Sequence, residues 1–576
     1  MVLNSYKLTK KGKEGKGMTT RPLPIGIDDY KKLIDNGYYY VDKTLLIKEL
    51  LDKKGEVNLF TRPRRFGKTL ALSMLQCYFE IEMDAEEKQI RKDSYFQGMK
   101  ILDAGDIYTS KMGQYPVISL SLKSAKQPTF EMAYLSLVDE IAKEYKRHKY
   151  ILKSNIILES DKEHYQAIME KRANRISYAK AIDFLSEILF TFYEKKVIIL
   201  LDEYDVPLEN AYFKGFYTEM VDFIRSLFES ALKTNRNLEF AVITGCLRIS
   251  KESIFTGLNN LKIISITSHN FSEYFGFTQS EVSRILEYYG GSDKNSEVQK
   301  WYDGYFFGET EVYNPWSVIN YADNNFSAKP YWSNTSSNSI IRHLVEQADQ
   351  KTKAELQELM DGGVIEKPVH ENITYEDMDR TKDNLWNFLF FTGYLKKISE
   401  RLQIDTTYLK MKIPNAEVKY IYRNTIMEWF EEGLQKQNFS DLYQAMEERD
   451  TEKICEIITC QLSSTISFMD YAENFYHGFL AGILSQSQKY IVKSNREQGN
   501  GRSDIYMYTS SRRGRAFILE LKMADNMAHL EPRCREGLEQ IERNRYEQDL
   551  KTDGYEDITC YAIAFFQKDC EVLVKK

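Results

Sequence analysis

The chain has 576 residues, of which 43% are hydrophobic and 28% are charged, and its formal net charge is −7. These values are ordinary for a globular protein of several domains. They exclude a disordered chain and a polycation, so a nucleic-acid site would have to be a local basic patch. The seven cysteines are odd in number and form no CxxC pair. They therefore argue against a disulfide framework or a zinc site and favour a reducing, cytoplasmic environment.

The N-terminal part of the chain begins with a tail and then alternates between helices and strands. Residues 1–20 are polar and rich in Lys and Gly, without the apolar core of a signal peptide, and we expect them to be disordered. Residues 28–54 predict two helices around a short aromatic strand at Tyr38–Asp42. A strand at Val57–Thr61, a basic loop and a helix at Leu70–Phe79 follow. The apolar stretches are too short to span a bilayer, so we expect no membrane partner.

The basic loop has the sequence and the setting of a phosphate-binding loop. It reads Arg-Pro-Arg-Arg-Phe-Gly-Lys-Thr from Arg62 to Thr69 and lies between a strand and a helix. Backbone N–H groups and the helix N-terminus would hold phosphate oxygens. Lys68 would neutralise the β- and γ-phosphates of ATP, and the Thr69 hydroxyl would bind Mg²⁺. Arg62 replaces the usual glycine and would limit the turn if this position required a positive φ. The nucleotide-binding residues predicted in the loop are Arg64, Arg65, Phe66, Gly67, Lys68, Thr69 and Leu70.

Two further predicted strands end in candidate residues that we expect to lie near this loop. The apolar run Val197–Leu201 has the pattern of a strand covered on both faces, and it ends in Asp202 and Glu203. Asp202 would hold Mg²⁺, directly or through water, and Glu203 would polarise the attacking water as a catalytic base. The next strand ends in Thr244, which could sense the γ-phosphate, and Arg248 could reach that phosphate in its own chain or in a neighbouring copy. A helix-capping Thr and a surface Arg are equally good interpretations of the last two residues.

The rest of the chain changes character twice. Strands that alternate with helices up to about residue 276 predict the parallel α/β sheet of a P-loop NTPase. A helical region follows, whose aromatic loops we interpret as loop cores rather than base-stacking platforms. A helix with a strand hairpin at 386–413 suggests a winged-helix-like unit, and a third α/β pattern starts at 490. The predicted domains are a tail at 1–20, a P-loop domain at 21–276, a helical or winged-helix-like linker at 277–440 and a C-terminal α/β domain at 441–576.

The C-terminal domain carries two carboxylates and a lysine at a spacing that suits metal-assisted chemistry. Asp504 begins one predicted strand, and Glu520 and Lys522 lie on the next. Residues two apart in a strand face the same way, and a hairpin would place Asp504 beside them. Asp504 and Glu520 could then share one Mg²⁺, while Lys522 orients or helps to activate a water. Because an acidic residue followed by Glu-x-Lys is common by chance, a solvated strand edge is the alternative interpretation.

Together these segments resemble the predicted AAA-ATPase-like family of bacterial proteins that carry a C-terminal PD-(D/E)XK nuclease domain. The resemblance covers most of residues 22–320, and Arg62 in place of glycine is typical of it. It implies a P-loop ATPase joined to a restriction-endonuclease-like α/β domain, in which Ser503 stands in place of the proline, as many members tolerate. The segments that carry the N-terminal resemblance are Leu23–Gly26, Tyr39–Thr44, Arg62–Thr69, Leu201–Asp205, Thr244–Ile249, Gly257–Asn260, Trp301–Tyr305 and Asn314–Ser317.

Further C-terminal positions complete the candidate nuclease site. Glu497 resembles an additional acidic position of this branch of the PD-(D/E)XK proteins. Gln540, with Tyr546 six residues later, resembles the accessory polar site of the branch, which places Gln540 among the catalytic candidates. Glu473 and His477 are four residues apart on one helix face and could also approach the metal.

Two functions fit these patterns. Residues 489–545 hold 12 Lys or Arg and 8 Asp or Glu, so this segment has a local charge of +4. Its arginines at 512–515 and 533–545 could contact nucleic-acid phosphates or form a solvated surface. The first hypothesis is an ATP-regulated, Mg²⁺-dependent nuclease that acts on DNA, less readily on RNA, and that could be a homo-oligomer. The second is a nucleotide-dependent switch or scaffold whose nuclease-like domain binds nucleic acid or protein without cleavage.

Overall fold

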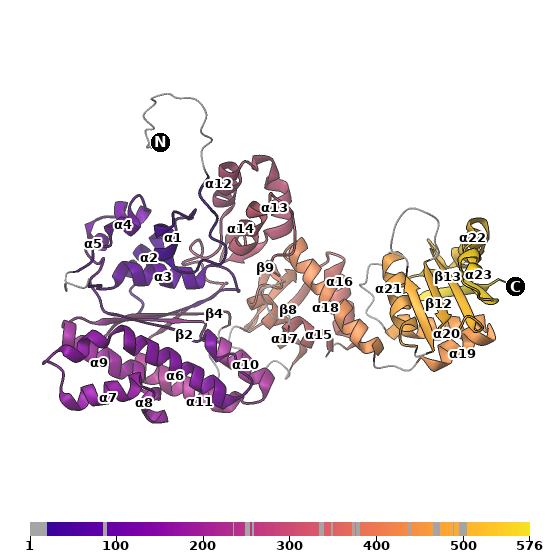
Figure 1. Cartoon of the computed structure of the whole chain (residues 1–576). Coiled ribbons are helices and arrows are strands. Elements are labelled where there is room, and N and C mark those ends of the chain that lie inside the picture. The colour runs from indigo at the N-terminus through magenta and orange to yellow at the C-terminus, as the bar shows by residue number, and fades with distance from the viewer. Residues whose placement is uncertain are drawn as a thin grey trace. The chain divides into compact units, whose positions relative to one another are not determined.

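The computed structural model describes residues 20–83, 89–233, 235–247, 254–255, 258–332, 339–346, 349–370, 375, 381–435, 439–464, 473–487, 489–494 and 504–575 (Figure 1). The chain divides into two compact units. The first takes the residues up to 332 together with 371–377, and the second takes 333–370 and 378–576. The predicted tail up to residue 19, Arg248, Glu497 and Ser503 lie outside the described residues.

A parallel five-stranded sheet forms the centre of the first unit. Its strand order is β2-β3-β4-β1-β5, and every neighbouring pair is parallel. All residues of β1 and β3 are buried, which explains their continuous apolar runs. The predicted parallel α/β sheet is confirmed. Its strands are β1 (Val57–Thr61), β2 (Val117–Ser121), β3 (Val197–Asp202), β4 (Leu238–Gly245) and β5 (Leu261–Ile264).

Helices cover both faces of this sheet, as its two-sided burial requires. The larger ones are α1 (Tyr30–Asp35), α2 (Leu45–Lys53), α3 (Lys68–Phe79), α6 (Phe130–Arg147), α7 (Glu159–Met169), α8 (Arg175–Ala179), α9 (Ala181–Tyr193), α10 (Val206–Lys214) and α11 (Tyr217–Leu232). In Figure 1, α2 and α3 lie on one side of the sheet, and α6, α9 and α11 lie on the other. The helix predicted at 70–79 is therefore confirmed as α3.

The aromatic strand predicted at 38–42 is wrong. These residues form no strand, and the backbone N–H of Tyr39 donates instead to the carbonyl of Pro22 at 2.9 Å. The ring of Tyr40 packs edge-on against Tyr30, with the ring centroids 5.3 Å apart. The aromatic side chains therefore pack against helices and do not belong to a β-sheet. A short aromatic run fits both a strand and a packed loop, so the sequence alone does not tell them apart.

Residues 265–332 complete the first unit. They add the helices α12 (Gln279–Tyr289), α13 (Asn295–Tyr302) and α14 (Pro315–Asp323) and the hairpin of β6 (Tyr305–Phe307) and β7 (Thr310–Val312). Tyr302, Tyr305 and Phe307 are buried, so the aromatic loops form loop cores, as predicted. The first unit thus continues past residue 276, and the predicted domain boundaries at 276 and 440 remain predictions.

The second unit begins with a small antiparallel sheet in the order β8-β10-β9. Its elements are α15 (Ser339–Glu346), α16 (Gln350–Met360), β8 (Ile365–Val369), α17 (Lys382–Phe391), β9 (Lys396–Gln403), β10 (Thr406–Lys412) and α18 (Ala416–Gln435). The predicted helix followed by a hairpin is confirmed as α17, β9 and β10. The third strand, β8, is an addition, and buried Asn387 ties it to α17 by donating to the carbonyl of Pro368 at 3.0 Å.

A second five-stranded sheet, in the order β11-β12-β13-β14-β15, ends the chain. Only its β13 and β14 pair is parallel, and α22 packs on these two strands and on β15. The α/β pattern predicted from residue 490 is confirmed. The elements are α19 (Ser440–Glu448), α20 (Thr451–Ser464), α21 (Glu473–Leu484), β11 (Tyr490–Ser494), β12 (Ile505–Thr509), β13 (Arg515–Met523), α22 (Leu530–Asn544), α23 (Glu547–Thr552), β14 (Asp557–Phe566) and β15 (Asp569–Val574).

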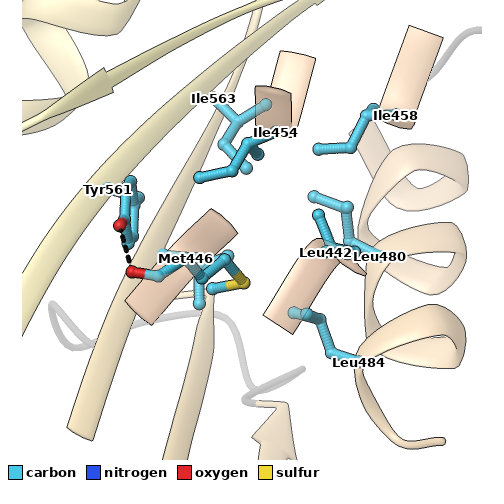
Figure 2. A pocket seen from close by; sticks show the side chains of 9 residues that line it. Leu442, Met446, Ile454, Ile458, Leu480, Leu484, Tyr561 and Ile563 are labelled. Carbon is cyan, nitrogen blue, oxygen red and sulfur yellow. Dashed lines mark hydrogen bonds between the residues drawn. The ribbon is translucent and has the colours of Figure 1, made fainter. Parts of the chain in front are cut away.

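A small cavity lies in the core between this sheet and the helices α19, α20 and α21. Figure 2 shows its side chains, which come from the three helices and from β13 and β14. The cavity measures about 10 Å³, which is at the limit for one water molecule, and its lining is largely aliphatic. We therefore regard it as a feature of core packing and not as a ligand site. None of the described helices combines the length and the apolar character needed to cross a membrane.

Candidate nucleotide and nuclease sites

The loop between β1 and α3 has a backbone shaped for anions. Arg65 and Gly67 both adopt the left-handed conformation, with φ of 70° and 82°. Gly67 is the N-cap of α3. A Cβ at this position would meet no atom within 4 Å, so glycine is favoured by the positive φ and not by a lack of space. The first N–H groups of α3 have no partner within the helix, which suits phosphate oxygens. Leu70 lies in this first turn and is half-buried.

The ammonium group of Lys68 is held by the loop itself. It donates to the carbonyl oxygens of Arg62 and Pro63 at 2.8 and 2.9 Å, and its Nζ lies 3.6 Å from the sulfur of Cys246. Lys68 is buried although it carries a charge. Both carbonyls belong to the predicted phosphate loop, so the ammonium is already directed at the space where phosphates are expected.

The carboxyl ends of β3 and β4 meet the start of α3 at Asp202. The hydroxyl of Thr69 donates to Asp202 Oδ2 at 2.7 Å, and the hydroxyl of Thr244 donates to Asp202 Oδ1. In a parallel α/β sheet this edge is where ligands bind. The structure therefore brings together all three residues that the sequence predicted for this position.

Glu203 follows Asp202 at the same edge and has a left-handed backbone, with φ of 53°. Burial raises the pKa of Glu203, and the neighbouring charge of Asp202 raises it further, while Lys68 and Lys123 oppose both effects. A carboxylate with a raised pKa is a better proton acceptor. The position and the pKa of Glu203 thus suit the predicted base.

Arg62 does not restrict the turn of the loop. Its φ is not positive, so a glycine at this position has no conformational advantage. The side chain is fully buried, and its guanidinium donates to the carbonyls of Thr61 and Ile264 at 2.9 Å and lies over the rings of Phe275 and Phe307. Burial lowers the pKa of Arg62 to about 9. Arg62 is therefore a packing residue beneath the loop.

Three other loop side chains bind protein groups. Arg64 forms an ion pair with Glu209 of α10, and the guanidinium of Arg65 lies 4.3 Å from the ring centroid of Trp316. The ring of Phe66 is buried against the aromatic rings of β6. Because these side chains contact other parts of the protein, the nucleotide contacts predicted for Arg64, Arg65 and Phe66 would come from their backbone N–H groups.

The residues that follow Glu203 hold the segment after β4. The hydroxyl of Tyr204 donates to the carbonyl of Leu247 at 2.5 Å, and Asp205 Oδ2 accepts from the N–H groups of Cys246 and Leu247 at 2.7 and 3.0 Å. Both residues lie in a segment that carries the family resemblance, but the sequence indicated no role for either of them. They fix the start of the segment that leads to Arg248, whose own position lies outside the described residues.

In the second unit, the predicted hairpin of β12 and β13 is confirmed. Ile505 pairs with Leu519, so Asp504 and Glu520 are the next opposed residues and face the same side of the sheet. Asp504 Oδ2 accepts from the N–H of Leu521 at 2.8 Å, which fixes the carboxylate against β13. The two candidate metal ligands are therefore neighbours.

Lys522 and Gln540 connect these carboxylates to α22. The ammonium of Lys522 donates to Glu520 Oε1 at 3.0 Å and to Gln540 Oε1 at 2.8 Å, and Gln540 Nε2 donates to the hydroxyl of Tyr546 at 3.2 Å. Four of the sequence-predicted residues thus form one continuous network. Gly537, which the sequence did not indicate, lets α22 come this close to the sheet, because a Cβ there would lie only 3.0 Å from the Cβ of Ala562 on β14.

Glu520 has an unsatisfied carboxylate oxygen. The residue is 2% exposed, and its Oε2 has no hydrogen-bond partner among the described residues. Burial raises the pKa of Glu520 to about 7, the charge of Asp504 raises it as well, and Lys522 opposes them. A buried carboxylate oxygen that faces a second carboxylate is a place where a cation is stabilising.

The donor set fits a hard cation such as Mg²⁺, which typically takes one or two carboxylates and keeps several waters. Across the described part of the chain, no group of three or more His, Cys, Asp and Glu is placed to hold an ion. His477 Nε2 lies 3.0 Å from the main-chain oxygen of Asp504, so it contacts the backbone of the site. The side chain of Glu473 and all of Glu497 lie outside the described residues.

The two sites correspond to two family matches. Residues 24–255 match the model of the family described as predicted AAA-ATPase, and residues 471–575 match that of the PD-(D/E)XK nuclease superfamily. Both halves of the predicted resemblance are confirmed. A protein of Azotobacter chroococcum mcd 1, named only as an uncharacterized protein in the vnfD 5' region, is 26% identical over 411 residues. These residues are 70% of this chain and 69% of the relative. No solved structure matches the chain.

The PD-(D/E)XK match begins inside the compact C-terminal fold. Helix α20 ends before residue 471, yet it packs on β15 of the same sheet. Within the matched segment, Arg533 and Arg535 form ion pairs with Glu536 and Glu531 on α22. These pairs occupy two of the arginines counted in this segment, whereas Arg512 and its neighbour in the β12–β13 turn are exposed.

Proposed function

We propose that the AAA-ATPase-like segment binds ATP with Mg²⁺, and that the bound nucleotide controls cleavage of DNA phosphodiester bonds by the PD-(D/E)XK segment, in a cytoplasmic setting. The observation that carries this proposal is the buried Glu520 carboxylate, whose Oε2 lacks a partner among the described residues. Burying Glu520 beside Asp504 is costly, and the ammonium of Lys522 balances only one of the two negative charges, so a further cation would be stabilising.

In the nuclease site, Asp504 and Glu520 would hold Mg²⁺. When bound, the ion would polarise a phosphodiester oxygen and lower the pKa of a water. Lys522 is held by Glu520 and Gln540, so its ammonium is oriented to position the attacking water and to balance developing negative charge. The N–H of Leu521 fixes the Asp504 carboxylate. Gln540, itself held by Tyr546, keeps Lys522 in this orientation.

In the nucleotide site, the N–H groups at the start of α3 would bind phosphate oxygens. Lys68 would exchange its two loop carbonyls for the β- and γ-phosphates, and Thr69 and Asp202 would hold Mg²⁺. Glu203 would accept the proton of the attacking water, for which its raised pKa is suited. Thr244 reaches this site through Asp202, and the γ-phosphate contact of Arg248, from its own chain or from a second copy, belongs to the proposal.

Nucleotide binding can be tested directly with Lys68→Ala. We expect this variant to bind ATP with Mg²⁺ about 10- to 100-fold more weakly than the wild type, because a hydrogen-bonded charge is lost. Isothermal titration calorimetry measures the affinity, and Lys126→Ala, at an exposed lysine of the same unit, is the matched control. A folded Lys68→Ala protein with unchanged affinity would remove the P-loop from the proposal.

The alternative function is a nucleotide-dependent switch or scaffold that binds nucleic acid or protein without cleaving it. The ion pairs of Arg533 and Arg535 favour it, because they leave fewer cations for a DNA backbone. A cleavage assay on labelled DNA and RNA, with Mg²⁺ or Mn²⁺ and with or without ATP, separates the two. Cleavage by the wild type that Lys522→Ala abolishes supports the nuclease, whereas binding without cleavage supports the scaffold.

A further inference from the structure

Two thiols of the C-terminal fold are in contact. The sulfurs of Cys455 on α20 and Cys570 on β15 are 3.7 Å apart. The Cys455 sulfur also lies 2.9 Å from the carbonyl oxygen of Cys570, and the hydroxyl of Thr459 lies 3.6 Å from the Cys570 sulfur. Both cysteines are reduced, Cys455 being half-buried and Cys570 buried. This contact depends on the packing of α20 against β15. The sequence does not indicate it, because the two residues are 115 positions apart.

The chemistry of the pair favours oxidation at Cys455. The hydrogen bond with Cys570 lowers the pKa of Cys455 to about 7, although burial opposes it. The same interaction raises the pKa of Cys570. Of the two thiols, the one that ionises more readily is thus the half-buried one, which a small oxidant can reach. The thiol of Cys570 lies directly beside it. Redox-sensor cysteines are often arranged in this way, with one thiol that is oxidised first and a second, resolving thiol that then forms the disulfide.

We propose that Cys455 and Cys570 are a redox-sensitive pair, in which a peroxide oxidises Cys455 and Cys570 then closes a disulfide between α20 and β15. The Cys455 thiolate attacks one peroxide oxygen, the O–O bond breaks, and the leaving hydroxide takes up a proton to become water. The Cys570 thiol then attacks the sulfur of the sulfenic acid, and the second oxygen leaves as water. Two thiols and one hydrogen peroxide thus give one disulfide and two waters.

The structure leaves little distance to close. The sulfurs must approach from 3.7 Å to a bond of about 2.05 Å, which side-chain rotation and a small shift of α20 can supply. The bond would tie a helix to the edge strand of the sheet and would close a long loop of chain, which restricts the unfolded state. Oxidation should therefore stabilise the C-terminal fold. This inference does not depend on the proposed nuclease or ATPase activity.

The test uses the reduced full chain, treated with hydrogen peroxide and mapped as peptides without reduction. We expect a cross-linked peptide pair that contains Cys455 and Cys570, and a rise in melting temperature that dithiothreitol reverses. Cys570→Ser should leave Cys455 as a sulfenic acid that dimedone traps, without the rise in melting temperature. Cys460→Ser, at an exposed cysteine on the same helix, is the control and should still form the cross-link.

Three results would overturn the proposal. The first is that peroxide modifies Cys460 while Cys455 and Cys570 stay reduced. The second is a cross-link of either residue to a different cysteine. The third is that Cys570→Ser shows the same rise in melting temperature as the wild type, because the stabilisation would then have another source.

Discussion

Metal binding at Glu520 should depend on pH near neutrality, because this carboxyl must lose its proton before it can bind a cation. Burial and the charge of Asp504 raise the pKa of Glu520 from 4.5 to about 7. A competing proton weakens the apparent affinity by about 11-fold at pH 6 but only about 1.1-fold at pH 8. Mn²⁺ should therefore bind about tenfold more tightly at pH 8 than at pH 6. A carboxyl with an ordinary pKa would show almost no difference between these two values.

Isothermal titration calorimetry of the metal-free chain with Mn²⁺, in the absence of nucleotide, measures this difference. Glu520→Gln keeps the size of the side chain, lacks the titrating group and should lose this binding event. His477 is a second titratable group near Asp504, so His477→Gln is the control and should keep the tenfold change. Equal wild-type affinities at pH 6 and pH 8 would refute the assignment of Glu520 as a buried metal ligand.

Two further variants test the nucleotide site. Glu203→Gln should bind ATP as the wild type does but hydrolyse it at least about 100-fold more slowly, since the amide does not accept a proton from water. A steady-state ATPase assay measures this, and wild-type turnover in the variant would take Glu203 out of that role. Asp205→Ala should lower the free energy of unfolding by about 2 kcal/mol, because the N–H groups of Cys246 and Leu247 lose their acceptor. Asp205→Asn keeps an acceptor oxygen and should lose less in urea denaturation, and equal losses would show that these hydrogen bonds are not what Asp205 contributes.

The parts of the site that local patterns determine could be predicted from the sequence. Glu520 and Lys522 are two apart in a strand, and the hairpin length brings Asp504 to them. The apolar run before Asp202 similarly placed its carboxylate at the carboxyl edge of a parallel sheet. In both cases the period of the backbone fixes the direction of the side chain.

Features that depend on contacts distant in the sequence could not be predicted. The buried guanidinium of Arg62 lies over Phe275 and Phe307, more than two hundred positions away, so the sequence suggested a limit on the turn and not a packing role. Asp205 has its role because β3 and β4 are adjacent in the sheet. The contact of Cys455 with Cys570 likewise appears only once α20 packs on β15.

The most direct test of the proposed function is the initial rate of DNA cleavage in Mg²⁺, with and without ATP. We expect the wild type to cleave DNA at a rate that ATP changes severalfold. Lys522→Ala should not cleave under either condition, and Lys68→Ala should cleave at one rate whether or not ATP is present. Metal-dependent cleavage that Lys522→Ala leaves unchanged, or no cleavage by the wild type under either condition, would contradict a nucleotide-controlled nuclease.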